Sequence, residues 1–234
     1  MCTVSFIPKS NSDFILTSNR DESPNRNTLA PQLYDIDGVK LLFPKDEIAG
    51  GTWIGASTKK RLICLLNGGF VAHQRAESYR LSRGVIVTEL LIAEDAVEKI
   101  NTFDFEGIEP FTIILVDWSF DLKLYELVWD GENIHFSKKP LQPTIWSSSL
   151  LYNADVKNKR EIWFSDFMDA NKVVNEEEII HFHKTAGEGN KETNLIMDKI
   201  FVKTKSITEF SKINGKCEMR YEDIITNKIF KQSL

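Results

Sequence analysis

Cys2, directly after Met1, is the residue of this sequence whose position most clearly predicts chemical reactivity. Removal of Met1 would make Cys2 the first residue, with a thiol and a free α-amine on the same residue. An α-amine has a pKa of about 7.7–8.0 and can accept the thiol proton, so such a cysteine carries its own general base. The position therefore predicts nucleophilic catalysis by Cys2, with a small buried cysteine as the alternative.

The stretch Asn19-Arg20-Asp21-Glu22 is the second candidate, because four polar residues follow a short β-prone segment. Asp21 is suited to anchoring or orienting the α-amine of Cys2. Arg20 is suited to lowering a thiol pKa or holding a substrate carboxylate. Successive residues of a strand point to opposite faces, so both can serve Cys2 only where the strand bends or ends. An ordinary polar loop is the alternative interpretation.

Two glycine-rich stretches form the third candidate, Gly50-Gly51-Thr52-Trp53-Ile54-Gly55 and Asn67-Gly68-Gly69. An Asn beside glycines at a strand end can direct its side-chain N–H groups at a developing oxyanion, assisted by backbone N–H groups. Asn67 is therefore a candidate oxyanion donor. The same Asn-Gly-Gly sequence is also a common turn signal.

The first third of the chain predicts the strands that must position these residues. Alternating apolar residues and polar turns indicate antiparallel hairpins over residues 3–18, 33–43 and 52–67. On an alternating strand Cys2 shares a face with Val4 and Phe6. We expect that face to be buried, with the nucleophile at the inner edge of a cleft.

The apolar period changes after residue 83, where apolar residues recur at helical spacing and predict one or two helices over residues 83–102. Further helices are expected over residues 155–170 and, after a capping box formed by Asn175 and Glu178, up to Lys184. Strands are expected over residues 111–117, 123–129, 133–137, 144–148, 205–213 and 216–223. This order is typical of sheets packed together under outer helical layers.

Composition excludes several classes of protein. The chain has 234 residues, of which 42% are hydrophobic and 27% charged, with a formal net charge of −5, so it is globular and lacks the basic stripe of a nucleic-acid binder. No apolar run approaches a membrane span, and the start lacks the features of a secretory signal. Three cysteines without CxxC spacing indicate a reducing compartment. We expect one domain over residues 1–234 and a cytoplasmic location, and the oligomeric state stays open.

The remaining histidines and cysteines carry weaker signals. His73 falls in a loop near Asn67 and is a candidate for ligand contact. His181 and His183 point apart on a helix, so we expect a solvated helix end and no metal site. Cys64 lies on the apolar face of its strand, which predicts core packing.

Taken together, the motifs resemble the NRDE family, named for the tetrapeptide at positions 19–22 and also called the transport and Golgi organisation protein 2 family. The matching pieces occur in order within residues 1–84: Met1-Cys2, Asn19-Arg20-Asp21-Glu22, the segment from Gly50 to Gly55, Asn67, and Ser82-Arg83-Gly84 at the start of a helix. The sequence departs from the family's pattern at Ser148, which stands where the family usually has the Asn of a Ser-Asn pair.

The resemblance implies an α+β fold, the four-layer αββα sandwich of two antiparallel sheets found in N-terminal-nucleophile hydrolases. The family is similar to the choloylglycine hydrolase and penicillin V acylase group. Those enzymes use a Cys freed by Met removal, an Arg and an Asp on the neighbouring strand, and Asn residues for the oxyanion. This implies catalytic roles for Cys2, Asp21 and Asn67. Arg20, the fourth catalytic candidate, fits less well, because the Arg of those hydrolases precedes the Asp by several residues.

Two functions of different classes follow. The first is an amidase-type hydrolase that cleaves a small amide or related acyl compound through an acyl-enzyme on Cys2, with no required cofactor. The second is a non-catalytic carrier that binds haem, a lipid or an acyl-CoA-like apolar ligand in the same pocket, since a cysteine thiolate can ligate haem iron. In either case the candidates for contact with the bound molecule are Asn19, Trp53, His73 and Ser148.

Overall fold

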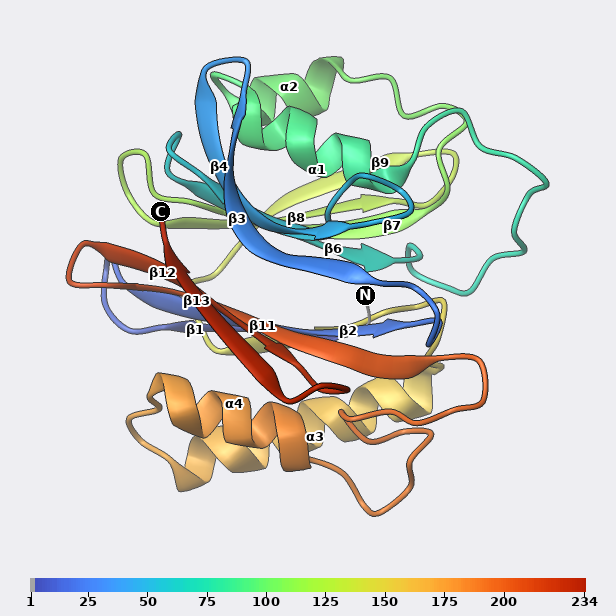
Figure 1. Cartoon of the computed structure of the whole chain (residues 1–234), viewed down its shortest axis with the longest axis vertical. Coiled ribbons are helices and arrows are strands. Elements are labelled where there is room, and N and C mark those ends of the chain that lie inside the picture. Colours follow the sequence, from blue (N-terminus) through green and yellow to red (C-terminus); the bar gives the residue numbers. More distant parts are fainter. Residues whose placement is uncertain (1–2) are drawn as a thin grey trace.

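Two antiparallel sheets, stacked face to face, form the centre of the protein in this computed structural model, which describes residues 3–234 (Figure 1). The six-stranded sheet has the spatial order β10 (Thr144–Ser147), β1 (Thr3–Pro8), β2 (Phe14–Glu22), β11 (Lys203–Ile213), β12 (Lys216–Asp223), β13 (Lys228–Ser233). The seven-stranded sheet has the order β3 (Thr28–Ile36), β4 (Val39–Asp46), β5 (Ile54–Ser57), β6 (Arg61–Asn67), β7 (Phe111–Asp117), β8 (Lys123–Trp129), β9 (Ile134–Lys139).

Helices cover the outer face of each sheet. Helices α1 (Arg83–Ile92) and α2 (Ala96–Thr102) pack on the seven-stranded sheet, whereas α3 (Ala154–Ala170) and α4 (Glu176–Thr185) pack on the six-stranded sheet (Figure 1). The fold is therefore the four-layer αββα sandwich, and the fold class predicted from the sequence is confirmed.

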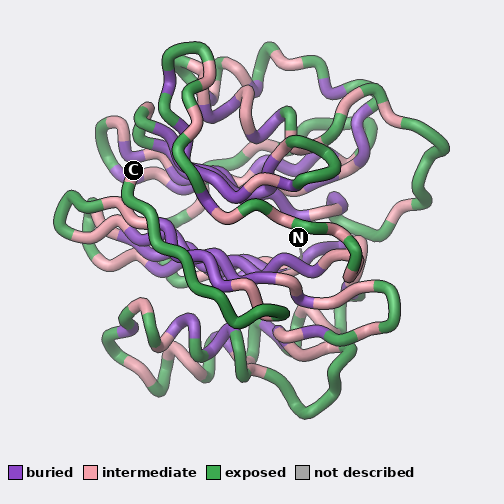
Figure 2. Tube along the Cα trace, viewed as in Figure 1, coloured by how far each residue is buried: buried purple, intermediate pink, exposed green. Residues whose placement is uncertain are grey.

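Strand alternation explains why apolar residues separate the layers. In β1 and β2, Val4, Phe6 and Leu16 face the other sheet, while Ile7 and Ile15 face the helices. The first group joins a core between the two sheets, and the second joins a core under α3 and α4. A third core lies under α1 and α2. Figure 2 shows that the central strands of both sheets are buried, as expected for strands covered on both faces, whereas the edge strands β9 and β13 are largely exposed.

The predicted hairpins form, and two of them, β1–β2 and β3–β4, extend further than expected. Strand β1 pairs with β2 in the register Val4 to Ser18, and β2 continues through the polar tetrapeptide to Glu22. The reason is that β11 pairs with β2 along this stretch, with a register irregularity between Thr204 and Ser206. The tetrapeptide is thus strand rather than loop.

The other observed helices and strands agree with those predicted from the sequence, apart from a strand at the carboxyl end. The predicted environment of one histidine also differs from the observed one. Helical residues after position 83 form two helices, because Asp95 caps a new start at α2, and the capping box of Asn175 and Glu178 is present at α4. Strand β13 was not predicted. The expectation that His183 lies at a solvated helix end is wrong: His183 is fully buried between α4 and the six-stranded sheet. Among the described residues no helix has the length and apolarity needed to cross a membrane.

Candidate active site

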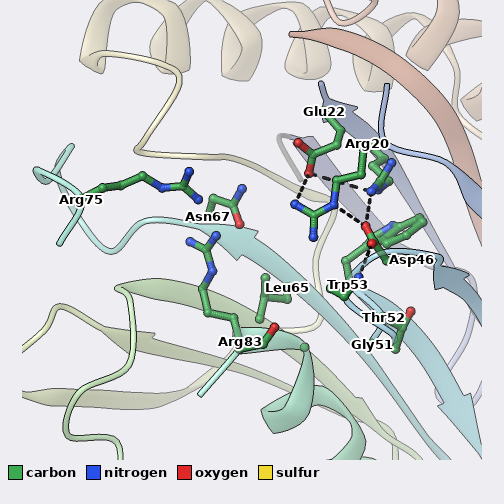
Figure 3. A pocket seen from close by; sticks show the side chains of 14 residues that line it. Arg20, Glu22, Asp46, Gly51, Thr52, Trp53, Leu65, Asn67, Arg75 and Arg83 are labelled. Carbon is green, nitrogen blue, oxygen red and sulfur yellow. Dashed lines mark hydrogen bonds and ion pairs between the residues drawn. The ribbon is translucent and has the colours of Figure 1, made fainter. Parts of the chain in front are cut away.

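A cavity of about 150 Å³ lies where β2 and β6 end and α1 begins (Figure 3). Strand β2 contributes Arg20 and Glu22, and β6 contributes Leu65 and Asn67. The other lining residues come from the segment after β2, the end of β4, the β4–β5 connection, the loop after β6 and the start of α1: Arg26, Asp46, Ala49, Gly51, Thr52, Trp53, Arg75, Ser82, Arg83 and Gly84. Most of the functional groups facing this space are charged.

Arg20 is held on one wall by contacts from the opposite sheet. Its Nη2 donates a hydrogen bond to Oδ2 of Asp46 at 2.6 Å, and its guanidinium carbon lies 4.4 Å from the ring centroid of Trp53. The side chain is almost completely buried, with Glu22 at 3.8 Å as a second ionic partner. Burial lowers the pKa of Arg20, while Glu22 and Asp46 counteract that effect. Trp53 therefore serves as the surface on which this cation rests.

Asp46 anchors the arginines of this wall. Its Oδ1 accepts hydrogen bonds from the backbone N–H groups of Ile48 and Ala49, and its Oδ2 accepts from Arg20 and from Nε of Arg26 at 2.7 Å. Burial would raise the pKa of this carboxyl, but the Ala49 N–H and the two guanidinium groups lower it below its ordinary value. Asp46 is thus an ionised, fully engaged carboxylate that orients both arginines.

Two buried donors that belong to the lining have no acceptor among the described residues. They are Nη1 of Arg20 and the indole Nε1 of Trp53. Nearly all buried N–H groups in proteins are hydrogen-bonded, so unpaired donors of this kind call for an explanation. Both donors therefore lie buried in the residues that form this wall of the cavity, without an acceptor.

A close approach of two glycines brings α1 to the cavity. A Cβ on Gly84 would lie 3.0 Å from the carbonyl oxygen of Thr52, and 3.5 Å from Cα of Gly51. A side chain at Gly84 would therefore crowd the backbone of Thr52, whereas a Cβ on Gly51 would lie at ordinary van der Waals distance from Gly84, at 3.5 Å. The glycine segment that contains Gly51 and the Ser82-Arg83-Gly84 motif therefore lie in contact. This contact positions Arg83 on the opposite wall of the cavity.

That opposite wall carries a second cluster of arginines. Arg83 Nη2 and Arg75 Nε each lie 3.0 Å from a carboxylate oxygen of Glu109, and His73 Nε2 lies 3.3 Å from the same carboxylate. Burial would raise the pKa of Glu109, yet the Arg75 hydrogen bond and the charges of Arg83 and Arg75 lower it. His73 thus contacts Glu109, the carboxylate that pairs with Arg75 and Arg83, and does not itself line the cavity.

Asn67 lies between the two walls, at the end of β6. Its side-chain amide lines the cavity and has no hydrogen-bond partner within residues 3–234. Ser148 does not reach the cavity; its Oγ donates to the backbone oxygen of Asn67 at 2.6 Å and so ties the end of β10 to the end of β6. Gly68 follows with a φ of +87°, and a Cβ there would lie 2.9 Å from the backbone nitrogen of Leu150. This turn holds the Asn67 backbone in place.

Asn19 and Asp21 point to the other face of the six-stranded sheet, because β2 does not bend. Asn19 Nδ2 donates to the backbone oxygens of His183 and Leu195, and its Oδ1 lies 2.7 Å from His183 Nδ1. Asp21 accepts from the hydroxyls of Tyr152, at 2.9 Å, and Thr204. Of the sequence candidates, the structure brings Arg20, Trp53 and Asn67 together in the cavity and places Asn19, Asp21, His73 and Ser148 around it.

The start of β1 is held beside this site by a buried arginine of α3. Arg160 Nη1 donates to Oγ1 of Thr3 at 2.6 Å, and its guanidinium stacks at 3.6 Å on the ring of Tyr152. Thr3 pairs with Asn19 on β2, one residue from Arg20. Cys2, the candidate nucleophile, lies outside the described residues.

The other two cysteines are poor nucleophiles. Cys64 is fully buried in the core between the sheets, as the sequence predicts, and burial raises the pKa of its thiol to about 12. Burial also raises the pKa of Cys217, which is partly exposed. Neither thiol is expected to form much thiolate at neutral pH.

Several charged groups at this site were not singled out from the sequence. Arg83 had a signal, since it is the centre of the Ser82-Arg83-Gly84 motif, but the motif alone assigns it no role. Asp46, Arg75 and Glu109 had none, because each is an ordinary charged residue until the fold brings its partners near.

Solved structures similar to this chain include a bile acid hydrolase, a penicillin acylase and an acid amidase. A conjugated bile acid hydrolase from Clostridium perfringens has a TM-score of 0.64 at 9% identity, over 100% of this chain and 92% of that chain. Penicillin V acylase from Agrobacterium tumefaciens has a TM-score of 0.54 at 9% identity, over 100% and 86%. The Caenorhabditis elegans orthologue of N-acylethanolamine-hydrolyzing acid amidase has a TM-score of 0.57 at 12% identity, over 89% and 92%. At these identities the likeness establishes the fold alone.

Family membership rests on the sequence as a whole. No curated protein sequence matches the chain. A sequence model for Transport and Golgi organisation 2 matches residues 1–227, which include every motif described above. The chain therefore belongs to the Transport and Golgi organisation 2 family.

Proposed function

We propose that this protein is an N-terminal-nucleophile hydrolase that cleaves a small amide or related acyl compound with Cys2. The observation that carries the proposal is a charged cavity beside the start of β1, in a fold shared with hydrolases of acyl-amide compounds. Thr3 of β1 pairs with Asn19 of β2, the residue before Arg20, so the first described residue of β1 lies next to the strand that carries the cavity wall. A nucleophile at the first position is what this location would need.

The chemistry follows from groups that these residues supply. After removal of Met1, the Cys2 α-amine accepts the thiol proton and the sulfur attacks the substrate carbonyl carbon. The side-chain N–H groups of Asn67, which have no other partner in the described chain, are available to the oxyanion. As the tetrahedral intermediate collapses, the ammonium returns its proton to the leaving amine, and the acyl group remains on sulfur.

Water completes the cycle. The Cys2 α-amine takes a proton from water, and the resulting hydroxide equivalent attacks the thioester carbonyl. The bond from carbon to sulfur then breaks, which releases the acid as product and leaves Cys2 as a thiolate. The cation of Arg20, fixed by Asp46 and Trp53, favours the thiolate. Asp21 acts from the other face of β2, where Tyr152 and Thr204 hold its carboxylate in one orientation for the α-ammonium.

The character of the lining favours this function over an apolar carrier. Arginines and carboxylates surround the cavity, whereas a haem or lipid site is lined mainly by apolar side chains. A polar acyl compound suits such a lining better than a haem macrocycle or a lipid tail, and no step of the chemistry above requires a cofactor.

The test is the reactivity of the thiol at position 2. The intact mass of the purified protein is measured before and after a pulse of limiting iodoacetamide at pH 7, and peptide mapping locates the label. We expect loss of Met1 and labelling of Cys2 at least about tenfold faster than of Cys217, because Cys64 and Cys217 have raised pKa values. A Cys2→Ala variant is the matched control and should lose the fast phase only.

Retention of Met1, or a Cys2 that reacts no faster than Cys217, would exclude the mechanism. Fast and selective labelling would justify a screen of N-acyl amides and activated esters, with the acyl-enzyme detected as a mass increase on Cys2. Titration with haem and fatty acids then serves as the comparison, since tight binding there without acyl transfer would identify a carrier instead.

A further inference from the structure

The charges around the cavity do not balance within the described chain. Four arginines line it, Arg20, Arg26, Arg75 and Arg83, together with the carboxylates of Glu22 and Asp46. Glu109 lies behind the lining and is shared by Arg75 and Arg83. Four guanidinium groups thus share three carboxylates, which leaves an excess of positive charge in a partly buried space. A partly buried excess of this sign attracts an anion.

Unpaired hydrogen-bond donors also favour an anion at this site. Arg20 is 2% exposed and its Nη1 has no partner among the described residues; the Nε1 of Trp53, a side chain 6% exposed, has none either. At the other wall, Ser82 makes no capping hydrogen bond to α1, and the first turn of α1 contains no acidic residue. Buried donors without acceptors are costly, and one anionic oxygen group offers several acceptors at once.

The positions of the donors locate the anion. Figure 3 shows the guanidinium groups of Arg75 and Arg83 pointing toward one another and toward the amide of Asn67, with Arg20 across the cavity. Gly51 and Gly84 allow the start of α1 to approach the same space. The donors therefore surround one region beside Asn67, where the proposed mechanism has the carbonyl under attack.

We propose that this cavity binds an anionic oxygen group of the substrate, a carboxylate or a phosphate, between Arg83 and Arg75 on one wall and Arg20 on the other. The inference rests on the proposed function, in that it names the substrate class: an acyl compound with an anionic group close to the scissile bond. Planar guanidinium groups bind such oxygens in a bidentate manner, and a cationic or wholly apolar substrate would leave the excess positive charge of the cavity uncompensated.

The first experiment does not depend on a reactive thiol. The melting temperature of the Cys2→Ala protein is measured at constant ionic strength with inorganic phosphate, with succinate and with neutral succinamide. We expect a saturable rise with an anion and none with succinamide. A larger effect of succinate identifies a carboxylate site, and a larger effect of phosphate identifies a phosphate site.

Arginine variants separate this site from general salt effects. Arg83→Gln and Arg75→Gln should each weaken anion binding about tenfold or more, and Arg83→Lys should retain part of it. Arg75 is largely exposed, so its substitution tests the site without risk to folding. Arg80→Gln is the control, since Arg80 lies in the same loop, carries the same charge and does not line the cavity. Equal shifts in all variants, or no saturable shift, would overturn the inference.

A second experiment distinguishes failure of this inference from failure of the proposed function. The rates at which iodoacetate and iodoacetamide label Cys2 are compared in the wild type and in Arg83→Gln. We expect the ratio of the iodoacetate rate to the iodoacetamide rate to fall in the variant. If iodoacetamide labels Cys2 selectively but the ratio is unchanged, the anion site is refuted and the nucleophile stands. If neither reagent labels Cys2 selectively while the Cys2→Ala protein binds anions, the nucleophile is refuted and the site stands.

Discussion

At the scale of single residues, β2 divides its polar tetrapeptide between two environments. Arg20 faces the other sheet and meets Asp46 and Trp53, whereas Asn19 and Asp21 face the helices. Because side chains alternate along a straight strand, neighbours in sequence serve different purposes. Asn19 holds a buried histidine, while Arg20 shapes the cavity.

That buried histidine has a defined protonation state. His183 Nδ1 lies 2.7 Å from Oδ1 of Asn19 and therefore donates, and Nε2, 2.8 Å from Oγ of Ser5, accepts from that hydroxyl. Burial, together with the charge of Arg160, lowers the pKa of His183 to about 3. The ring is thus neutral in the folded protein at physiological pH.

We expect His183 to make the protein sensitive to acid. Its pKa is lower in the folded state than the ordinary value of about 6.5, so the unfolded chain binds more protons between the two values. Stability is therefore complete above pH 6.5 and falls as the pH drops toward 3, by at most about 1.4 kcal/mol per pH unit from this group. Urea denaturation between pH 4 and 7 should show a steeper decline for the wild type than for His183→Gln. Parallel pH profiles for the two proteins would contradict this assignment.

At the scale of elements, α4 and α1 differ in how the first turn of the helix is capped. Helix α4 begins with a capping box, in which Asn175 accepts from the N–H of Glu178 and the Glu178 side chain accepts from the N–H of Asn175. Helix α1 begins at the cavity, where Ser82 makes no such bond. The start of α4 is thus stabilised by two side-chain hydrogen bonds, whereas the start of α1 has no side-chain cap.

A matched pair of substitutions tests this difference. We expect Asn175→Ala to lower the free energy of unfolding by about 1 kcal/mol, because it removes a capping hydrogen bond. Ser82→Ala should change it by less than about 0.5 kcal/mol, since Ser82 has no capping bond to lose. Chemical denaturation of both variants gives the comparison. Equal losses would show that Ser82 caps α1 in solution.

At the scale of the whole molecule, the layer between the six-stranded sheet and α4 holds two titratable groups with opposite effects. His183 lies there, and so does Glu209 of β11, whose Oε2 has no hydrogen-bond partner within the described part of the chain. Burial first, and then the charge of Glu176, raise the pKa of Glu209 to about 8, against the opposing charge of Arg220. The carboxyl is therefore protonated near neutrality.

Glu209 is expected to limit stability on the alkaline side. Its pKa in the folded state exceeds the ordinary value of about 4.5, so its contribution is complete below pH 4.5 and is lost as the pH rises through 8. Glu209→Gln keeps the shape and removes the charge. We expect the variant to be more stable than the wild type by a few kcal/mol at pH 9 and similar to it at pH 5, measured by urea denaturation. A wild type that is at least as stable as the variant at pH 9 would contradict the raised pKa. Together with His183, this group places the greatest stability between mildly acidic and neutral pH.

Much of the fold was predictable because its determinants are local. Alternating apolar residues, the turn at Asp37-Gly38 and the capping box at α4 specify their elements within a few positions, and the structure confirms them. The resemblance carried by the motif at positions 19–22 and by the glycine segments also implies the layered fold. Strand β13 was missed because its six residues are all exposed and show no apolar alternation.

The candidate site was predictable only in part, because its geometry depends on contacts between distant residues. The sequence by itself determined that Cys2, Arg20, Trp53 and Asn67 carry suitable chemistry. Only the tertiary structure decided that β2 runs straight through Asp21, since that depends on pairing with β11, some 180 residues away in sequence. Likewise Glu109 meets Arg75 and Arg83, and His183 meets Asn19, across separations that no local pattern encodes. Local patterns specify which face of an element is apolar, but the partner of a buried charge is chosen by the packing of whole layers.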